Sequence, residues 1–418
     1  MALAWLAPWG RRPRWLITTA AVVLALTPFA HLPDGSGRHL LPRWDLYLVS
    51  AGLFRPTVAR DALASEEWSR PELVYYRDGI STTVTVEKWS KEHFSLKNNG
   101  KVDASTGDDM PTQIAVGLVP LLLHPRSPDF APEGALIGSA SGVSAGAILQ
   151  YPVRRLDVVE LEPAIIAGSK YFNHVNNRPL RDRRTRLYAD DGRNFLAAGR
   201  ALYDVIVNEP SNPWITGVSN LFTREYFEIA KRRLRPDGVF CTWAQLYEMA
   251  PRRVKAIYRA FAAVFPHVYA FSASPLSADT FLVGSRRPLR LQIDRLRRAF
   301  AIPRLKKELV RGDMTSPHDL AALALMGPGE MHAFVVGSST NTDDNALVEF
   351  AAPRDLYNHR RYDYYLARIY GQNWLYGRLD DMVDGYRRPQ DYAGLVRSLL
   401  THGRFREAHR FFPRVKPR

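Results

Sequence analysis

Three short elements that follow one another along the chain have the residue types of a nucleoside site. The first is a run of small residues, 138–146 (GSASGVSAG). Small residues let the backbone approach a ligand closely, and the N–H groups of a helix that starts there can hold polar ligand atoms. Glu160 follows about 20 residues later. At this spacing a carboxylate can accept hydrogen bonds from both hydroxyls of a ribose. The third element, Asp190, Asp191 and Gly192, would lie beside an adenine amino group.

Each of these acids has a simpler structural explanation, because Asp and Glu often cap helices or close turns. Their order along the chain favours the nucleoside site over three independent caps. The run of small residues lacks the G-x-G-x-x-G spacing of dinucleotide-binding folds, so NAD is not the expected ligand.

The elements that must position these residues are apolar strands that alternate with amphipathic helices from Gly134 onward. Such alternation predicts an α/β fold with a mostly parallel sheet covered on both faces. The acids then fall at the carboxyl ends of successive strands, the edge where open α/β sheets bind ligands. Seven strands with a hairpin at the end form the Rossmann-like architecture of class I AdoMet-dependent transferases. The expected strands span 135–140, 156–161, 185–190, 203–209, 238–244, 267–273 and 279–285.

A small β-domain is expected ahead of this fold. Residues 74–89 (VYYRDGISTTVTVEKW) alternate β-branched with polar residues, and 97–100 (KNNG) supply a hairpin turn. The predicted β-domain, together with a segment that gates substrate entry, spans residues 73–133.

Several ordered motifs resemble those of the spermidine/spermine synthase family, the polyamine aminopropyltransferases. The resemblance extends over roughly residues 75 to 285 and is greatest to the membrane-linked, spermidine-synthase-like subgroup, in which such a domain follows transmembrane helices. The motifs are DDMPTQ with PLLLHP (108–125), the glycine loop, VELEP (159–163), DDGRNF (190–195), YDVIVNEPSNP (203–213) and LFTREYF (221–227).

The resemblance implies a site for decarboxylated AdoMet, or AdoMet, as co-substrate. Glu209 falls on the family's catalytic aspartate and would accept a proton as an amine attacks the carbon next to the sulfonium. General-base help of this kind is worth about 10² to 10⁴ in rate. The expected nucleoside-binding residues are Gln113, Gly138, Ser141, Gly142, Glu160, Asp191 and Gly192.

Three positions depart from the family pattern. Ser141 stands where the family has the acid that holds the aminopropyl amine, and Asn212 replaces the second acid of the catalytic loop. Thr112 replaces a tyrosine of the diamine channel. A dicationic diamine needs carboxylates, because desolvating an ammonium without a counter-charge costs several kcal/mol. The nucleoside half of the family's site is therefore retained, whereas the polyamine half has lost acidic residues. The expected acceptor residues are Asp108, Asp109, Thr112, Asn212 and Tyr226.

The predicted activity is transfer of an aminopropyl group from decarboxylated AdoMet to an amine acceptor. Ser141 and Asn212 leave a second possibility, an AdoMet-dependent methyltransferase acting on another nucleophile. A third is a catalytically inactive nucleoside-binding or interaction protein. No metal is expected, because the histidines lack ligand spacing and one cysteine, Cys241, can form neither a disulfide within the chain nor a zinc ribbon.

The chain is strongly basic, with 57 Lys and Arg against 42 Asp and Glu, which gives a net charge of +15. No aromatic-interleaved motif accompanies the arginine clusters, so a solvated basic surface is favoured over nucleic-acid binding. The expected partners are a small-molecule amine, a membrane and, for a homodimer, a second copy of the chain.

An uncharged run, residues 15–33, follows Arg11, Arg12 and Arg14 and approaches the roughly 20 residues that span a bilayer. An uncleaved single-pass anchor is favoured over a cleaved signal peptide or the last helix of a longer membrane region. Arginines beyond the run (Arg38, Arg43, Arg55 and Arg60) leave its orientation open, and the catalytic domain is expected on the cytoplasmic side. The domain plan is then an anchor 1–33, a linker 34–72, the β-domain 73–133, the nucleoside-binding catalytic domain 134–290, a helical and loop extension 291–360 and a helical tail 361–418.

Two further segments have structural interpretations. The run 341–345 (NTDDN) lacks the calcium-loop pattern and predicts an Asx turn before a strand-like segment that begins at Val348. The tail from Tyr392 has the apolar spacing of one tetratricopeptide-like hairpin and predicts a terminal pair of helices.

Overall fold

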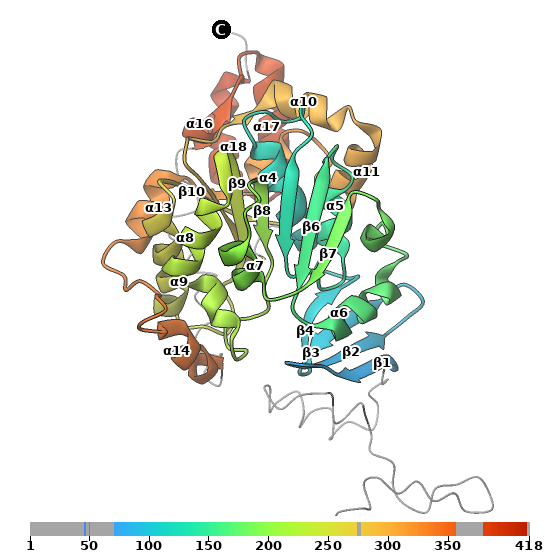
Figure 1. Ribbon diagram of the computed structural model, residues 1–418. Helices are drawn as coiled ribbons and strands as arrows, with labels where there is room; N and C mark the ends of the chain where they lie inside the picture. Colours follow the sequence, from blue (N-terminus) through green and yellow to red (C-terminus); the bar gives the residue numbers. More distant parts are fainter. Residues whose placement is uncertain (1–45, 47–49, 51–70, 274–276, 357–378, 416–418) are drawn as a thin grey trace, which may run out of the picture. The chain divides into compact units, whose positions relative to one another are not determined.

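The computed structural model describes Leu46, Ser50 and residues 71–273, 277–356 and 379–415. The chain divides into two units, residues 1–52 and 53–418. The account below concerns the second unit, whose ribbon is drawn in Figure 1.

The core of this unit is a mixed sheet in the order β13-β10-β11-β9-β8-β5-β6-β7. The five strands from β7 to β9 are parallel, and β11 runs antiparallel between β9 and β10. This order confirms the predicted Rossmann-like sheet and its closing hairpin. The strands are β5 (Glu133–Ile137), β6 (Arg155–Glu160), β7 (Thr185–Ala189), β8 (Tyr203–Asn208), β9 (Leu234–Gln245), β10 (His267–Ser272), β11 (Asp279–Ser285) and β13 (Ala324–Met326).

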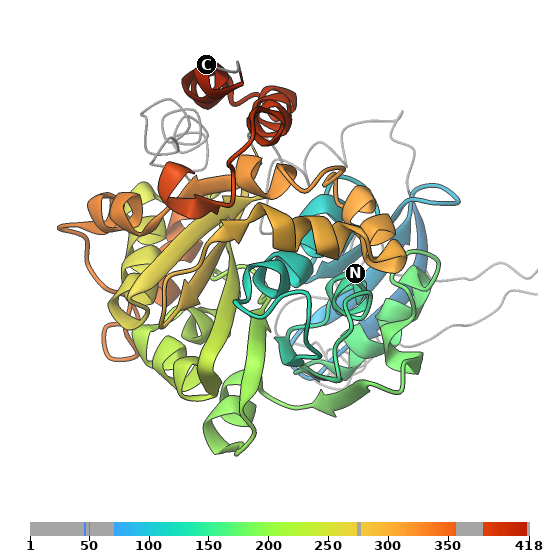
Figure 2. The same cartoon turned by 90° about the horizontal axis from the view of Figure 1, so that it is seen from above.

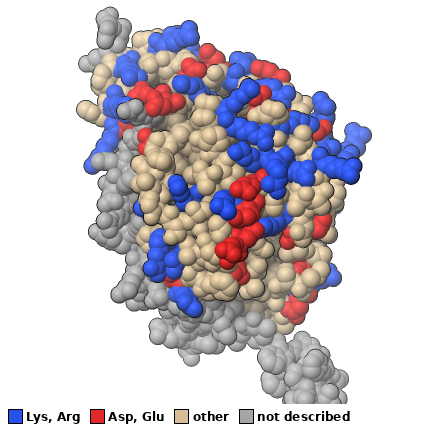
Figure 3. All heavy atoms as spheres, turned by 60° about the vertical axis from the view of Figure 1, so that its left-hand side comes forward, with Lys and Arg blue, Asp and Glu red and all other residues tan. Residues whose placement is uncertain are grey.

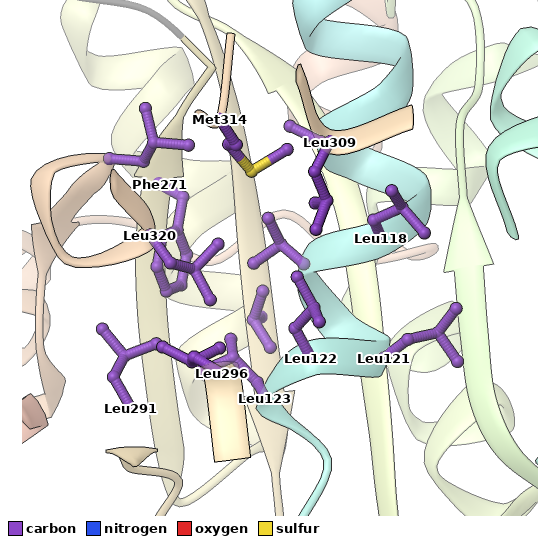
Figure 4. Packing of buried hydrophobic residues seen from close by; sticks show 14 of the residues in the cluster. Leu118, Leu121, Leu122, Leu123, Phe271, Leu291, Leu296, Leu309, Met314 and Leu320 are labelled. Carbon is purple, nitrogen blue, oxygen red and sulfur yellow. The ribbon is translucent and has the colours of Figure 1, made fainter. Parts of the chain in front are cut away.

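Helices cover both faces of the sheet (Figures 1 and 2), so its central strands are apolar on both sides. All six residues of β8 are buried, with Val205 and Val207 in one core cluster and Ile206 in the other. Figure 4 shows the first cluster, where Leu118 and Leu122 pack with side chains of the 291–320 region. The helices of this face are α4 (Met110–Leu123), α5 (Val143–Ile148), α10 (Ile293–Phe300), α11 (Pro303–Arg311) and α12 (Asp319–Ala322).

The opposite face is covered by helices whose aromatic side chains form the second cluster. Phe227, Phe240 and Phe261 lie within 6.0 Å of one another, measured between ring centroids. The helices of this layer include α7 (Gly192–Ala198), α8 (Arg224–Arg232), α9 (Pro251–Val264), α13 (Pro328–Val335) and α14 (Leu347–Leu356).

The predicted β-domain is a four-stranded antiparallel sheet. Asn99 (φ 48°) and Gly100 (φ 84°) form the two-residue turn between β3 and β4. A turn with both residues at positive φ matches the twist of a hairpin, which is why Asn-Gly occurs there. Val86 packs with Ile165 of α6 (Pro163–Gly168) and so attaches this sheet to the larger fold. The strands are β1 (Glu72–Asp78), β2 (Thr83–Lys88), β3 (Phe94–Asn98) and β4 (Lys101–Ser105).

Two expectations differ from the structure. The sequence analysis missed β13, a three-residue strand that pairs with β10 at the edge of the sheet. The strand predicted after the NTDDN run is wrong, because this segment is helix α14. Its buried residues Val348, Ala351 and Ala352 have the i, i+3, i+4 spacing of a helix face, whereas Phe350 is 70% exposed.

The chain after residue 378 forms α16 (Leu379–Met382), α17 (Pro389–Thr401) and α18 (Phe405–Phe411). The helices α17 and α18 confirm the predicted terminal pair. Strand β14 (Val383–Asp384) pairs in parallel with β12 (Leu291–Gln292). None of the helices in the described ranges is both long and apolar enough to cross a bilayer, and the run 15–33 lies outside those ranges.

Many arginines of the basic surface are paired. Arg184 contacts Asp182 at 2.7 Å, and Arg311 contacts Glu308 at 2.7 Å. Figure 3 shows basic and acidic side chains side by side on one face. Such pairing is typical of a solvated, charged surface.

Candidate functional site

The glycine loop connects β5 to α5 and lies against the loop that follows β8. Gly138 and Gly142 have φ values of 85° and 81°, a region that favours glycine. A Cβ on Gly138 would lie 2.3 Å from the carbonyl oxygen of Glu209. The N–H of Glu209 also donates to the carbonyl of Ile137 at 2.8 Å. The two loops therefore touch through their backbones, and a side chain at position 138 would separate them.

Glu160 ends β6 at the expected edge of the sheet and is 6% exposed. Its Oε2 accepts hydrogen bonds from the N–H of Ser139 at 2.8 Å and from its hydroxyl at 3.2 Å, while Oε1 accepts from the N–H of Glu162 at 3.0 Å. Burial raises the pKa of Glu160, although these hydrogen bonds oppose the rise. The carboxylate thus shapes the glycine loop, and its contact with a ribose stays a prediction.

The third expected element also meets β5. Asp191 caps α7 by accepting from the N–H of Asn194 at 2.7 Å, so its simpler structural role is present as well. A Cβ on Gly192 would lie 2.2 Å from Cγ2 of Ile137. Only glycine lets the start of α7 pack this closely on β5. The structure therefore brings the glycine loop, Glu160 and Asp191 to neighbouring strand ends, as the sequence predicts.

Gln113 and Ser141 bond to each other inside the protein. The hydroxyl of Ser141 donates to Oε1 of Gln113 at 2.5 Å, and Nε2 of Gln113 donates to the carbonyl of Ser105 at 2.9 Å. Both side chains are buried. Asn176, which the sequence analysis did not single out, donates to the carbonyl of Ser141 at 2.9 Å. The bond between Ser141 and Gln113 attaches the glycine loop to α4. Both the oxygen and the nitrogen of the Gln113 amide have hydrogen-bond partners within the protein.

Glu209 directly follows β8, beside the glycine loop, and its side chain is half-buried. Burial raises the pKa of Glu209 to about 8, and a hydrogen bond with Ser144 lowers it in part. A carboxyl with a pKa within about one unit of the working pH suits proton transfer. Burial, and then the charge of Glu209, raise the pKa of the Cys241 thiol on β9. This thiol is therefore protonated and unreactive in the folded protein.

The loop after Glu209 is held by two neighbours. Ser211 donates to Asp103 of β4, and Nδ2 of Asn212 donates to the hydroxyl of Tyr247 at 3.3 Å. Asn212 is 0% exposed, and its Oδ1 has no hydrogen-bond partner among the described residues. The loop after Glu209 is thus attached to the β-domain on one side and to the residues that follow β9 on the other.

A group of residues that the sequence analysis missed adjoins this loop. Lys101 Nζ lies 3.4 Å from Asp103 Oδ1 and 5.9 Å and 6.0 Å from the ring centroids of Trp243 and Tyr247. Nε1 of Trp243 donates to Asp279 at 3.1 Å. We call these five residues the Lys101 cluster. Burial raises the pKa of Asp279 to about 6, although the positive charge of Lys101 lowers it in part.

The remaining acceptor residues are dispersed. Asp108 is exposed, Asp109 is half-buried at the start of α4, and Thr112 is buried within that helix. Tyr226 has no exposed surface, and its hydroxyl donates to Asn208 at 2.8 Å. Its surroundings are those of a core residue, which does not favour the predicted role of Tyr226 in acceptor binding.

The NTDDN run forms the predicted Asx turn, because Oδ1 of Asn345 accepts from the N–H of Leu347, two residues further on, at 3.1 Å. Asp343 of this run makes an ion pair with Arg193, which follows Gly192. Within the ranges that the structure describes, no three His, Cys, Asp or Glu side chains are grouped so as to hold a metal ion.

The sheet order defines a Rossmann-like α/β fold, and the glycine loop and the acids lie together at the carboxyl edge of its sheet. Residues 114–278 match the model of the spermine/spermidine synthase domain. The chain therefore carries a spermine/spermidine synthase domain, which confirms the resemblance to that family.

Curated relatives include polyamine aminopropyltransferases. Polyamine aminopropyltransferase 2 of Streptomyces coelicolor is 26% identical over 249 residues, 58% of this chain and 40% of that protein. The Bacillus subtilis enzyme is 26% identical over 234 residues, 51% of this chain and 83% of that protein. Putrescine N-methyltransferase 2 of Nicotiana tabacum is 34% identical over 112 residues, 26% of this chain and 31% of that protein.

Solved structures with a similar fold include a probable spermidine synthase from Corynebacterium glutamicum, with a TM-score of 0.48 and 18% identity over 65% of this chain and 97% of that one. The spermidine synthase from Thermotoga maritima has a TM-score of 0.44 and 20% identity, over 51% of this chain and 73% of that one.

Proposed function

We propose that this protein transfers an aminopropyl group from decarboxylated AdoMet to an amine acceptor. The observation that carries the proposal is the placement of Glu209. It is the carboxyl that follows β8, it lies against the glycine loop, and burial raises its pKa to about 8. The match of residues 114–278 to the spermine/spermidine synthase domain supports the same reaction class.

In the proposed reaction, the amine nitrogen forms a bond to the propyl carbon as the bond from that carbon to sulfur breaks. The leaving group is neutral methylthioadenosine, and the proton of the attacking amine moves to the Glu209 carboxylate. A cationic sulfonium near Glu209 would favour the ionised carboxylate and lower its pKa towards neutrality. Binding of the donor would thus ionise Glu209, which can then accept the proton of the attacking amine.

The donor site would be built at the ends of β5, β6 and β7. Glu160 keeps the glycine loop in place and lies where the hydroxyls of a ribose would donate hydrogen bonds to its carboxylate, while Asp191 would lie near the adenine end. Backbone N–H groups of the glycine loop would meet the remaining polar atoms of the donor.

The test is calorimetry with decarboxylated AdoMet, AdoMet and methylthioadenosine side by side, followed by an assay for methylthioadenosine released with an added amine. Tighter binding of the decarboxylated donor and amine-dependent release support aminopropyl transfer. If none of the three nucleosides binds, the proposal fails and the interaction protein takes its place.

Methyl transfer from AdoMet is the second candidate, and Ser141 is the observation that favours it. The buried Ser141 supplies no carboxylate for the amine of an aminopropyl group. One relative of this chain is called a putrescine N-methyltransferase. Preference for AdoMet, with adenosylhomocysteine as the product, would select this candidate.

Outside the domain, we propose that residues 15–33 attach the protein to a membrane as a single-pass anchor, with the catalytic domain on the cytoplasmic side. The length of the uncharged run supports the anchor. Arginines lie on both sides of the run, so they do not by themselves favour either orientation. A homodimer also stays a proposal, which light scattering of the purified protein would test.

A further inference from the structure

Lys101 brings a positive charge of the protein itself into the acceptor half of the site. It is the first residue after the Asn99-Gly100 turn, and its side chain is 12% exposed. Its ammonium lies 3.4 Å from the carboxylate of Asp103 and near the faces of two aromatic rings. Carboxylates and aromatic faces together form the usual environment of a bound ammonium group.

The charges around Lys101 keep it protonated. Burial alone would lower the pKa of Lys101, but Tyr247, Asp103, Asp279 and Asp109 raise it above its usual value. Burial raises the pKa of Tyr247 to about 12, so its phenol is neutral at pH 7. At neutral pH the Lys101 ammonium is therefore attracted by the carboxylates of Asp103, Asp279 and Asp109, and it serves as their counter-ion.

This ammonium is attached to the loop that carries Glu209. Asp103, the nearest partner of Lys101, accepts a hydrogen bond from Ser211. Tyr247, over which Lys101 lies, accepts from Asn212. The Lys101 cluster and the proposed base are thus connected through one loop, the loop that follows β8.

Two buried amide side chains next to the cluster have polar atoms without a hydrogen-bond partner among the described residues. Gln245 is 1% exposed, and neither end of its side chain has a hydrogen-bond partner among the described residues. It pairs across the sheet with Asp279 and shares a face of β9 with Trp243, because side chains two residues apart point the same way. Oδ1 of Asn212 is the second such group. Buried amides left unpaired are costly, so they indicate a ligand that donates and accepts hydrogen bonds.

We propose that the Lys101 ammonium takes the place of the second ammonium of a diamine, so that the acceptor is an amine with one positive charge and an uncharged hydrogen-bonding group, such as an amino alcohol. This inference rests on the proposed amine-acceptor function. The reacting amine would approach Glu209, and the hydroxyl would meet the unpaired amides of Asn212 and Gln245. A diamine would instead bring a second cation beside Lys101.

The test compares putrescine with 4-amino-1-butanol, which differ in one terminal group. Wild-type protein should bind and use the amino alcohol better than putrescine. Lys101→Met should shift the ratio of the two affinities, and of the two kcat/KM values, towards putrescine by about tenfold or more, because it leaves buried carboxylates without their cation. A wild-type preference for putrescine, or a ratio that Lys101→Met leaves unchanged, overturns the proposal.

Lys88→Met is the matched control. Lys88 lies in the same small sheet and pairs with Glu72 at 3.2 Å, away from the loop of Glu209, so its substitution should leave the ratio unchanged. If Lys101→Met fails to fold, Lys101→Gln removes the charge with a polar side chain, and the wild-type preference is decisive without any variant.

The affinities are measured by calorimetry in the presence of methylthioadenosine and therefore do not require turnover. If neither amine releases methylthioadenosine from the donor, the proposed aminopropyl transfer fails. The ratio of amine affinities in wild type and Lys101→Met still decides the role of Lys101 in that case.

Discussion

Ser141 donates a hydrogen bond to Gln113 across 2.5 Å, and both side chains are buried. The position where related enzymes have an acid therefore fastens the glycine loop to α4. The replacement leaves no polar group unpaired, because Gln113 also donates to the carbonyl of Ser105. The segments 138–146 and 208–214 contain a single carboxyl between them, that of Glu209, so the proposed proton transfer between these two loops would depend on it.

Glu209→Gln should lower turnover by about 10²-fold or more while nucleoside affinity barely changes, because the amide keeps the shape of the side chain but cannot accept the proton. Single-turnover assays and calorimetry on the same preparation measure the two quantities. Should turnover per folded molecule stay within a few-fold of wild type, Glu209 has only a structural role.

The same carboxyl sets the expected pH dependence. Since burial raises the pKa of Glu209 to about 8, its ionised fraction, and with it kcat/KM, should rise with pH and level off above about pH 8. The amine also loses its proton with rising pH, so Glu209→Gln provides the reference, and its profile should lack the inflection near pH 8.

Stability should change in the opposite direction. The folded protein holds a proton on Glu209 that the unfolded chain releases near its ordinary pKa of 4.5. The free energy of unfolding should therefore decrease between about pH 4.5 and pH 8, and Glu209→Gln should reduce this decrease. Urea unfolding at several pH values measures it, and parallel curves for the two proteins would contradict the raised pKa.

Glu160→Ala should weaken methylthioadenosine binding by about 1 to 3 kcal/mol, the scale of hydrogen bonds to a charged group. The loss includes the bonds by which Glu160 holds Ser139 in the glycine loop. Glu228→Ala removes an exposed acid from α8 and serves as the control for net charge. Unchanged affinity in a folded Glu160→Ala protein would refute the ribose assignment.

Gly192→Ala should destabilise the protein by about 1 to 3 kcal/mol, because the new Cβ would lie 2.2 Å from Cγ2 of Ile137 in a packed core. Gly329→Ala is the control, since a Cβ there meets nothing within 4 Å. Thermal or urea unfolding of both variants measures the difference, and equal stabilities would show that β5 and α7 can move apart freely.

Deletion of residues 1–33 should release the protein from membranes, because this segment contains the uncharged run long enough to span a bilayer. The measurement is flotation of the full chain and of the truncated chain with vesicles of neutral and of anionic lipid. Continued binding of the truncated chain to anionic vesicles alone would assign attachment to the basic surface instead.

Local sequence signals predicted the elements that are long or carry distinctive turns. Six of the seven predicted strands have apolar runs that are mostly buried, whereas the edge strand β7 is partly exposed. Asn99-Gly100 fixes its hairpin through backbone conformation. Strand β13 has three residues, too few for a periodic pattern to appear. Helix α14 carries Pro353 within an apolar segment, so its helical spacing was obscured.

The donor half of the site was predictable because its residues follow the ends of consecutive strands. The Lys101 cluster was not, because Lys101, Trp243 and Asp279 come from three distant parts of the chain. Strand pairing brings Asp279 opposite Gln245, and the β3–β4 hairpin adds Lys101. An ammonium beside two aromatic rings is a property of this tertiary arrangement, and no short sequence window contains it.

The buried thiol of Cys241 can be used to measure how often the central strands of the sheet separate. It is the one cysteine of the chain and lies with 0% exposure on β9, between β8 and β11 at the centre of the sheet. A thiol reagent can reach this sulfur only when the central strands separate. The rate of labelling of the unmodified protein thus measures how often the sheet opens, and a nucleoside that bridges β5 and β6 should slow that rate in proportion to its affinity.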